Sequence, residues 1–491
     1  MPAAPGLDPW EAEAQAGRME LAETIPPAAA SPPPHDPSDR AFFGHPLAFG
    51  HIFATEVGLA FAYYGLISIL TLYMSSHLFL PGTAEGVIGF GPFSRMMEAT
   101  FGATSPLELA SATFGLVTGI FYATPLIGGL IGDRWLGTRT CIVAGLPIQT
   151  LGYALLVFEP TFLIGMALMV VGGGLVKSNL LGQVGALYGP EDPRRTRAFG
   201  LFLIAVNIGG FITPLVVGTL GEKVSWASGL AAAAVGMALA MLAYLSGAKH
   251  FPARRAIEPA AAQGKATATP GPAQGVVVAA LLLVLVGSML NIGAYNQAFN
   301  IFPVWAREHV DRQIGGFEVP VTWFSTLDGI LTIVATALAV KIWAWQARDG
   351  REPRETSRLM VGFALTACAF TVLALSAATF GGAKVHILLP ILFFMLADAA
   401  LPWVDTVIMA LFTRVGPAGL ATSLLGVYYL SFTGGNLLVG RMGQAYEHMA
   451  PSAFWGLHAA MAGAGLIWLA VLGGWMNRVY DASMRARAGQ A

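Results

Sequence analysis

The sequence predicts an all-α membrane protein whose twelve membrane-spanning helices form two bundles of six. Charged residues make up only 11% of the 491 positions, less than half of the roughly 25% typical of soluble domains. A spanning helix needs about 20 mainly apolar residues, and the chain offers twelve such runs. A charged, proline-rich break at 249–274 separates the sixth run from the seventh, which divides the chain into two equal sets.

The twelve apolar runs follow one another with short breaks. They are centred near residues 62, 119, 148, 174, 208, 236, 290, 333, 366, 399, 433 and 464. The first six give a bundle over 46–248 and the last six a bundle over 275–477. The break "KHFPARRAIEPAAAQGKATATPGPAQ" predicts a flexible cytoplasmic linker.

The two chain ends are predicted to be cytoplasmic tails, 1–45 and 478–491. The first is rich in alanine, proline and glutamate and has no apolar signal-peptide core, so we expect it to be disordered. Lysine and arginine gather in "DRWLGTR", "EDPRRTR" and "QARDGREPRETSR", which alternate with poorly charged loops. Under the positive-inside rule this pattern predicts a multi-pass protein of the plasma (inner) membrane with both termini in the cytoplasm.

Composition and motifs also exclude several function classes. The net charge is −1, so no basic surface indicates nucleic acid. The segments between the apolar runs carry no nucleophile constellation, phosphate loop or metal-ligand cluster. We therefore expect no enzyme, no cofactor and no metal site, and the lipid bilayer as the surrounding partner. The oligomeric state stays open, with a monomer as the expectation.

A few charged residues fall inside the apolar runs, where each costs about 2.5–3.5 kcal/mol. They are functional candidates for that reason: Glu56, Lys177, Asp328, Lys341, Asp398, Asp405 and Arg441. Glu56 and Lys177 lie at similar depths, about 12 and 15 Å from the cytoplasmic ends of their helices. We expect them to pair. Such a pair either only fixes helix packing or opens and closes during transport, with Glu56 able to take a proton.

Other polar residues share helix faces with these charges. Tyr63 lies seven residues after Glu56, on the same face of the first helix, and Tyr64 is its neighbour. The tyrosines either pack in the core or offer hydroxyls to a cavity. Asp398 and Asp405 are seven residues apart and are expected to face the same way. Asn207 is expected to be a buried amide that needs hydrogen-bond partners.

Several segments resemble the proton-dependent oligopeptide transporter (POT/PTR) family of the major facilitator superfamily. They are "ATEVGLAFAYYGLISILTLYM", "TPLIGGLIGDRWLGTRT", "GGGLVKSNLLGQVGALYGPEDPRRTRAFGLFLIAVNIGGFITPLVVGTLG", "WFSTLDGIL" and "LLGVYYLSFTGGNLLVG". The resemblance runs from about residue 42 to 475 and identifies a divergent member. It implies the major facilitator superfamily fold, with two six-helix bundles around a central cavity, and transport by alternating access.

Part of the family's functional pattern is present. The matching residue types are Tyr63, Tyr64, Tyr122, Lys177, Asn179, Asn207 and Gln297. The resemblance implies that Tyr63, Tyr64 and Asn207 line the peptide cavity and that Lys177 pairs with acids of the first helix. Glu56 matches the first acid of the family's E-x-x-E-R motif.

The first helix also departs from the family. The second acid of the motif falls at Leu59 and its arginine at Ala60, and the cation that grips a peptide carboxylate falls at Ile67. Loss of that cation removes the charge-assisted hydrogen bonds that hold a carboxylate. We therefore expect a substrate with an amine end and no required free carboxylate.

The second half departs as well. The family's seventh-helix tryptophan and glutamate fall at Ile292 and Asn296. Its eighth-helix asparagine, which helps to hold the peptide amino group, is Asp328. Its tenth-helix glutamate is best represented by Asp398, although the proline spacing differs. The predicted cavity is thus poorer in cations on one side and at least as acidic on the other.

The sequence as a whole predicts a secondary active transporter, a proton-coupled symporter of di- or tripeptides or peptide-like amine-bearing solutes. Proton coupling is assigned to Glu56, Lys177, Asp328 and Asp398. Substrate binding is assigned to Tyr63, Tyr64, Tyr122, Asn207, Asn296, Gln297, Asp328 and Asp398. Asp133 and Arg134 are expected to latch the inner gate. The alternatives are a proton-independent facilitator or exporter of a non-peptide solute, and a non-transporting membrane sensor.

Overall fold

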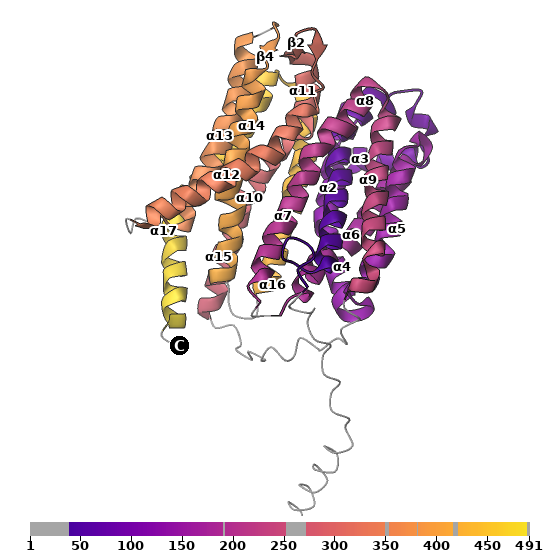
Figure 1. The fold of residues 1–491 in the computed structure, drawn as a ribbon. Helices are drawn as coiled ribbons and strands as arrows, with labels where there is room; N and C mark the ends of the chain where they lie inside the picture. The colour runs from indigo at the N-terminus through magenta and orange to yellow at the C-terminus, as the bar shows by residue number, and fades with distance from the viewer. Residues whose placement is uncertain are drawn as a thin grey trace, which may run out of the picture.

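The computed structural model describes residues 39–189, 192–251, 272–348, 353–380, 382–415 and 421–488. Its long helices form two groups that stand side by side (Figure 1). One end carries the short helix α3 (Phe90–Phe101) and the small strands, and we call it the hairpin end. The other end, where α17 finishes, is the terminal end.

The first group contains six long helices. They are α2 (Leu47–Tyr73), α4 (Pro106–Ile131), α5 (Thr138–Leu156), α6 (Phe162–Ala186), α7 (Arg194–Thr213) and α9 (Trp226–Ser246). A π-helical turn and the short helix α8 (Thr219–Lys223) extend α7 to the hairpin end. Glycines let these helices approach closely: a Cβ atom on Gly128 of α4 would lie 1.9 Å from the carbonyl oxygen of Gly174 on α6. Such small-residue contacts are the usual means of tight helix packing in membranes.

The second group repeats this arrangement. Its helices are α10 (Pro272–Tyr295), α11 (Ile301–His309), α12 (Trp323–Arg348), α13 (Glu355–Phe380), α14 (Leu388–Leu401), α15 (Val407–Val415), α16 (Ala421–Gly443) and α17 (Pro451–Ala488). Strand β1 (Val310–Asp311) pairs in parallel with β4 (Val385–His386). Strands β2 (Gln313–Ile314) and β3 (Phe317–Glu318) form an antiparallel hairpin.

The predicted count of spanning helices is confirmed. In the described part of the chain, ten helical segments are long and apolar enough to cross a membrane. The two remaining predicted runs, centred near 148 and 433, coincide with α5 and α16, which have 19 and 23 residues. The described residues therefore form a multi-pass, all-α membrane protein in which twelve helical segments match the twelve predicted runs.

The predicted ends of the chain need two corrections. Residues 39–45, expected to belong to a disordered tail, fold against α2: the rings of Phe42 and Phe53 lie 5.4 Å apart, and His45 Nδ1 lies 2.7 Å from the Tyr188 hydroxyl. Burial, and then the positive charge of Arg194, lowers the pKa of His45, which favours its neutral form in this contact. At the other end, α17 continues to Ala488, past the predicted limit of 477. The predictions for 1–38 and for most of 249–274 lie outside the described residues.

Two helices are interrupted at the middle of the second group. Helix α10 ends at Tyr295, and a 3₁₀ turn at Asn296–Ala298 precedes α11. The run predicted near 399 consists of α14, a π-helical turn at Pro402–Thr406 and α15. Proline has no N–H for the helix ladder, and π turns are common at functional sites. These breaks bring polar side chains to the interior of the group.

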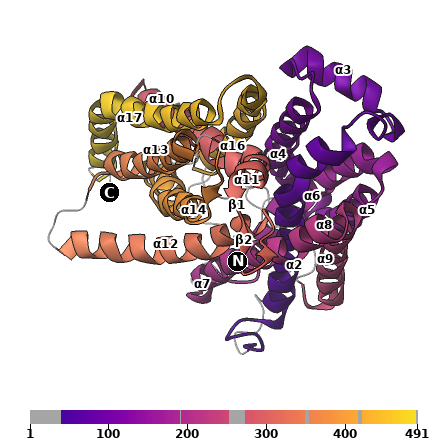
Figure 2. The same cartoon turned by 90° about the horizontal axis from the view of Figure 1, so that it is seen from above.

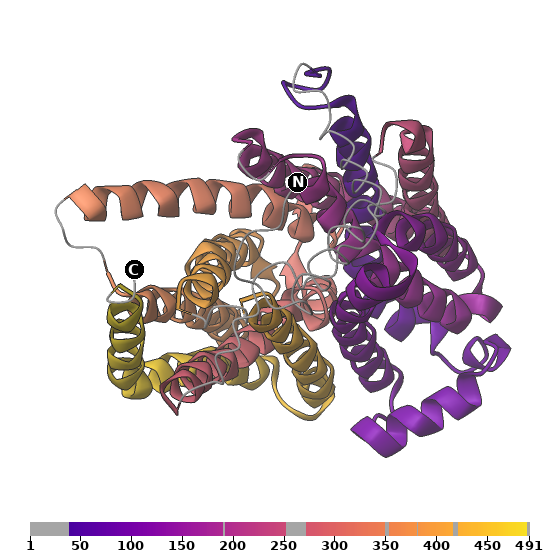
Figure 3. The ribbon, with the colours of Figure 1, turned by 90° about the horizontal axis from the view of Figure 1, so that it is seen from below.

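The two groups meet along two seams. Helix α4 packs against α16, and α7 packs against α12. Views along the helices show these pairs on opposite sides of the junction, with α12 reaching away from the rest of its group (Figures 2 and 3). The polar side chains considered below lie between or beside these seams.

Candidate transport site

The predicted ion pair is present in the first group. Nζ of Lys177 on α6 lies 2.5 Å from Oε1 of Glu56 on α2. The Glu56 side chain is fully buried, whereas 41% of the Lys177 side chain is exposed. The second carboxylate oxygen, Oε2, has no hydrogen-bond partner among the described residues. The pair thus has one buried acidic partner and one partner that can turn outwards.

The predicted tyrosines form an aromatic wall next to this pair. Tyr63 stacks on Phe121 with the ring centroids 4.4 Å apart and meets Tyr64 edge-on at 5.5 Å. Tyr122 of α4 stacks on Phe432 of α16 at 5.1 Å, across the junction of the two groups. Tyr63, Tyr64 and Tyr122 are all half-buried. They pack against aromatic rings and still keep part of their surface exposed. Core packing and the lining of a cavity are therefore both compatible with their positions.

Two predicted acids come together in the second group through a residue that sequence reasoning missed. The hydroxyl oxygen of Tyr295, at the end of α10, lies 2.5 Å from Oδ1 of Asp328 on α12 and 2.7 Å from Oδ1 of Asp398 on α14. Asp398 is fully buried, and Asp328 is half-buried. Tyr295 directly precedes the candidate Asn296, but no periodicity in the sequence shows which helices its ring faces.

The predicted amides divide between two environments. Asn296 is half-buried, and its Nδ2 donates to Oδ1 of Asn436 at 3.0 Å. Gln297 is fully buried and donates to the Val439 carbonyl at 2.9 Å, while Asn300 donates to Gln297 at 3.1 Å. Gln297 therefore links the turn after α10 to α16. Its role in substrate binding stays a prediction.

Asn207 differs from its expected environment. It is half-buried rather than buried, and its Nδ2 donates to the Leu203 carbonyl one turn earlier, at 2.9 Å. This bond within α7 uses one of the two amide N–H groups without a partner from another helix.

Asp398 and Asp405 do not share partners, although their spacing predicted one face. Asp398 accepts from Tyr295 of α10, whereas Asp405 accepts from the Tyr428 hydroxyl of α16 at 2.8 Å. The π-helical turn that starts at Pro402 lies between them and adds a residue to the local turn. It therefore shifts every later side chain around the helix axis.

The predicted gate residues lie at the terminal end of α4. Asp133 and Arg134 are exposed on the π-helical turn Gly132–Leu136. Of the ion pairs between described residues, none includes either side chain. Whether they latch a gate stays a prediction.

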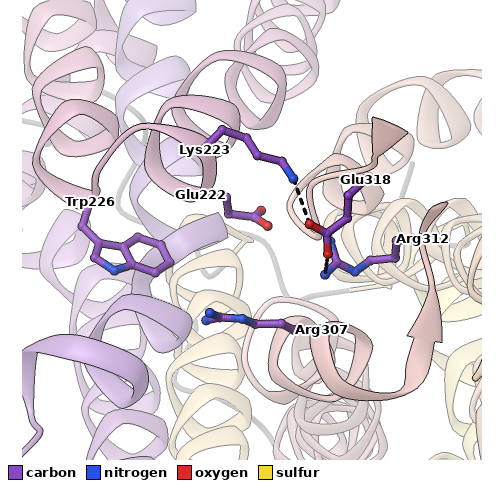
Figure 4. Close-up of a pocket in the computed structure, with 6 residues that line it drawn as sticks. All are labelled: Glu222, Lys223, Trp226, Arg307, Arg312 and Glu318. Atoms are coloured by element: carbon purple, nitrogen blue, oxygen red, sulfur yellow. Dashed lines mark hydrogen bonds and ion pairs between the residues drawn. The ribbon is translucent and has the colours of Figure 1, made fainter. Parts of the chain in front are cut away.

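The hairpin end carries a charged contact between the two groups that the sequence did not suggest. Lys223 of α8 lies 3.1 Å from Glu318 of β3, which also binds Arg312 at 2.6 Å. Glu222 accepts bonds from the backbone N–H groups of Val321 and Thr322, each at 2.9 Å. Figure 4 shows the charged side chains of the two groups facing each other across a cavity of about 150 Å³. The hydrogen bond from Lys223 and the charge of Arg312 lower the pKa of Glu318.

A second contact closes the same end along the α4–α16 seam. His448 Nε2 lies 2.6 Å from Oε1 of Glu108, and Arg441 donates to the Phe101 carbonyl at 2.6 Å. Further inside, Thr118 donates to Asn436 at 3.0 Å. The polar bonds between the groups thus concentrate towards the hairpin end. The described conformation is held shut at that end.

Comparison with known proteins agrees with this architecture. The chain is 26% identical over 477 residues to the peptide transporter YePEPT of Yersinia enterocolitica, covering 83% of this chain and 89% of that protein. It is 24% identical over 473 residues to the uncharacterized transporter YclF of Bacillus subtilis, with coverage of 85% and 91%.

Solved structures share the fold. A crystal structure of the peptide transporter POT in complex with sulfate matches with a TM-score of 0.79 and 22% identity, covering 90% of this chain and 97% of that one. A POT family transporter in complex with 5-aminolevulinic acid matches with a TM-score of 0.74 and 17% identity, covering 90% and 98%. The model of the POT family (PTR2) matches residues 139–269 and 273–452. Because that match spans more than half of the sequence, the chain belongs to the POT family.

Proposed function

We propose that this protein is a proton-coupled symporter that carries di- or tripeptides, or peptide-like solutes with an amine end, by alternating access. Peptide transport by relatives supports the substrate class. The observation that carries the proposal is the placement of charge. One group holds the Glu56–Lys177 pair, and the other holds two acids, Asp328 and Asp398, that take part in no ion pair between described residues.

The ion pair is the first proposed coupling site. A proton on Glu56 removes the charge that holds Lys177, so the lysine is released towards the cavity, where part of its side chain is already exposed. Loss of the proton restores the pair. Burial of a lone carboxylate is costly, so the proton and Lys177 compete for Glu56.

The acids of the second group are the proposed amine site. Asp328 is half-buried and presents a carboxylate near Tyr64 and Tyr122, with which it interacts electrostatically. Ile67, where relatives carry a cation, is only 6% exposed and belongs to the apolar core. The side chain at this position therefore offers no positive charge to a substrate carboxylate. An ammonium group meets the half-buried carboxylate of Asp328, to which the fully buried Asp398 is linked through Tyr295.

The contacts at the hairpin end support the alternating-access part of the proposal. They shut one end of the junction, while Asp133 and Arg134 at the other end are exposed. With the termini in the cytoplasm of a bacterial-type inner membrane, this conformation is inward-facing. Asp133 and Arg134 are then gate residues that engage when the inner side closes. We take the monomer as the working unit.

Uptake into proteoliposomes tests the function. Purified protein is reconstituted, and entry of radiolabelled alanyl-alanine is measured with an alkaline lumen, with equal pH on both sides, and with a protonophore. Accumulation that needs the pH gradient is the expected result. Uptake that only equilibrates and ignores the gradient overturns proton coupling.

The second candidate is a proton-independent facilitator or exporter. The specific observation in its favour is that Leu59 and Ala60, which replace the second acid and the arginine of the family motif, are buried at 6% and 3% exposure. In the ion pairs between described residues, no charged side chain from another helix replaces the missing acid and arginine. The same uptake experiment separates the two candidates, and binding of the dipeptide with no uptake at all favours a sensor.

A further inference from the structure

The contact between Tyr295 and two aspartates has a consequence for protons. A tyrosine hydroxyl has one O–H to donate and lone pairs with which to accept. Its oxygen lies 2.5 Å from one carboxyl oxygen and 2.7 Å from the other, both within the range of a full O–H···O hydrogen bond. The hydroxyl can donate to only one of them. The second bond requires that the other carboxyl brings its own proton.

We infer that Tyr295, Asp328 and Asp398 form one proton-binding centre, in which Asp398 carries the proton and donates it to the Tyr295 oxygen while Tyr295 donates to the Asp328 carboxylate. Tyr295 is the bridging residue of this centre. The three groups come from α10, α12 and α14, and the end of α10 at Tyr295 sets the position of the hydroxyl.

Burial assigns the proton to Asp398. Its side chain has no exposed surface, and its second oxygen, Oδ2, lacks a hydrogen-bond partner among the described residues. An ionised Asp398 would leave an unsatisfied, buried carboxylate oxygen, which costs more than an unsatisfied oxygen of the neutral acid. Asp328 is half-buried and keeps some access to water, so it is the member that bears the negative charge.

Among the described residues, each of the two acids interacts with Tyr295 and with the other acid. The titratable side chains that interact with Asp328 from the first group are Tyr64 of α2 and Tyr122 of α4. The ion pairs of the described residues include neither Asp328 nor Asp398. Without a cation, two carboxylates that share one hydroxyl repel each other, and a shared proton removes this repulsion.

The bridge also supplies a path for the proton. In the arrangement inferred above, Asp398 passes its proton to the Tyr295 oxygen while the Tyr295 hydroxyl passes its own proton to Asp328. Asp328 then releases this proton to the cavity. One O–H bond breaks and one forms at each transfer, so Tyr295 is neutral before and after, and the net change moves one proton from Asp398 to Asp328. Uptake runs the same steps in reverse. Tyr295 thus connects the accessible acid to the buried one.

The role of this centre in coupling rests on the proposed function, but its existence does not. It is tested by infrared spectroscopy of the purified full-length protein at neutral pH, in H₂O and D₂O. The carbonyl stretch of a protonated carboxylic acid, shifted by deuterium, is the expected signal. It should disappear in Asp398→Asn, and it should move in Tyr295→Phe because the acid loses the oxygen to which it donates.

The chain provides a matched control. Asp405 also accepts from a tyrosine, Tyr428, at 2.8 Å, and no second acid among the described residues bonds to that hydroxyl. Asp405→Asn and Tyr428→Phe should leave the signal of Asp398 in place. Gel filtration and thermal unfolding of all four variants confirm that they are folded before spectra are compared.

Three outcomes overturn the inference: no acid signal that Asp398→Asn removes, a signal that Tyr295→Phe leaves unmoved, or equal changes in the Asp405 and Tyr428 controls. Proteoliposome uptake of alanyl-alanine is measured in parallel. A spectroscopic signal without gradient-driven uptake overturns the proposed function and leaves the centre standing. Gradient-driven uptake without the signal overturns the centre alone.

Discussion

Lys177 reaches Glu56 with 2.5 Å between Nζ and Oε1, across 121 positions of sequence, and only the acid is fully buried. The asymmetry matters because the buried partner cannot be left charged and alone, whereas the lysine can turn to water. In the proposed function, protonation of Glu56 releases Lys177 from this pair. The first prediction uses this relationship.

Neutralising either partner should impair the protein more than neutralising both. Lys177→Gln leaves the buried Glu56 without its cation and should destabilise the fold by roughly 1–3 kcal/mol. This figure lies below the usual cost of breaking a buried pair, because Lys177 is partly exposed and Glu56 can take a proton. In the double variant with Glu56→Gln, the loss should be smaller. Thermal unfolding and dipeptide uptake measure the cycle, and additive losses would contradict the pairing.

Packing between α4 and α6 should not tolerate a methyl group at Gly128. The added Cβ would lie 1.9 Å from the Gly174 carbonyl oxygen, which is backbone and cannot turn aside. Overpacking costs about 1–3 kcal/mol or more, so Gly128→Ala should lower the unfolding temperature clearly. The control is Gly182→Ala on α6, where nothing lies within 4 Å of the added atom. Equal unfolding temperatures for the two variants would contradict the close approach.

The contact of Lys223 with Glu318 should depend on pH in a defined direction. The lowered pKa of Glu318 means that its contribution is present above the ordinary pKa of 4.5 and is lost as pH falls through the lowered value. Because these side chains are partly exposed, the contribution is below about 1 kcal/mol. Unfolding temperatures of the wild type and Glu318→Gln should differ at neutral pH and converge in acid.

Glu98→Gln is the matched control for that experiment, because Glu98 is exposed near the same end and belongs to none of the ion pairs between described residues. It should follow the wild type at every pH. A difference between wild type and Glu318→Gln that persists unchanged in acid would show that the contact does not depend on the charge of Glu318.

Blocking the carboxylate of a peptide should leave binding largely intact. Ile67 is apolar and buried at the position where the family resemblance implies a cation, and Asp328 is the proposed partner of the amine. Alanyl-alanine amide should therefore raise the unfolding temperature at least as much as alanyl-alanine, whereas the N-acetylated dipeptide should not. A ligand at 100 times its Kd adds about 2.7 kcal/mol, enough to detect. Stabilisation that needs a free carboxylate would contradict the interpretation of Ile67.

The sequence by itself determined the membrane class, the number of helices and one tertiary contact. The apolar runs are longer and less charged than soluble helices, and that signal is local. The Glu56–Lys177 pair was also predictable, because topology fixes the depth of each residue and a buried charge requires a partner. The family resemblance was visible in the same helices.

Only the tertiary structure decided which residues meet in the second group. Tyr295 bridges Asp328 and Asp398 because α10 ends beside α12 and α14, and the rotation of one helix against another is set by packing and leaves no periodic signal. The π-helical turn at Pro402 places Asp405 against Tyr428. Asp405 therefore does not face the same way as Asp398, although seven residues separate the two. The contacts at the hairpin end likewise join residues that are distant in sequence. Hydrophobicity determines which segments enter the membrane. The partners of each side chain inside it depend on how the helices are rotated against one another and on where they are interrupted.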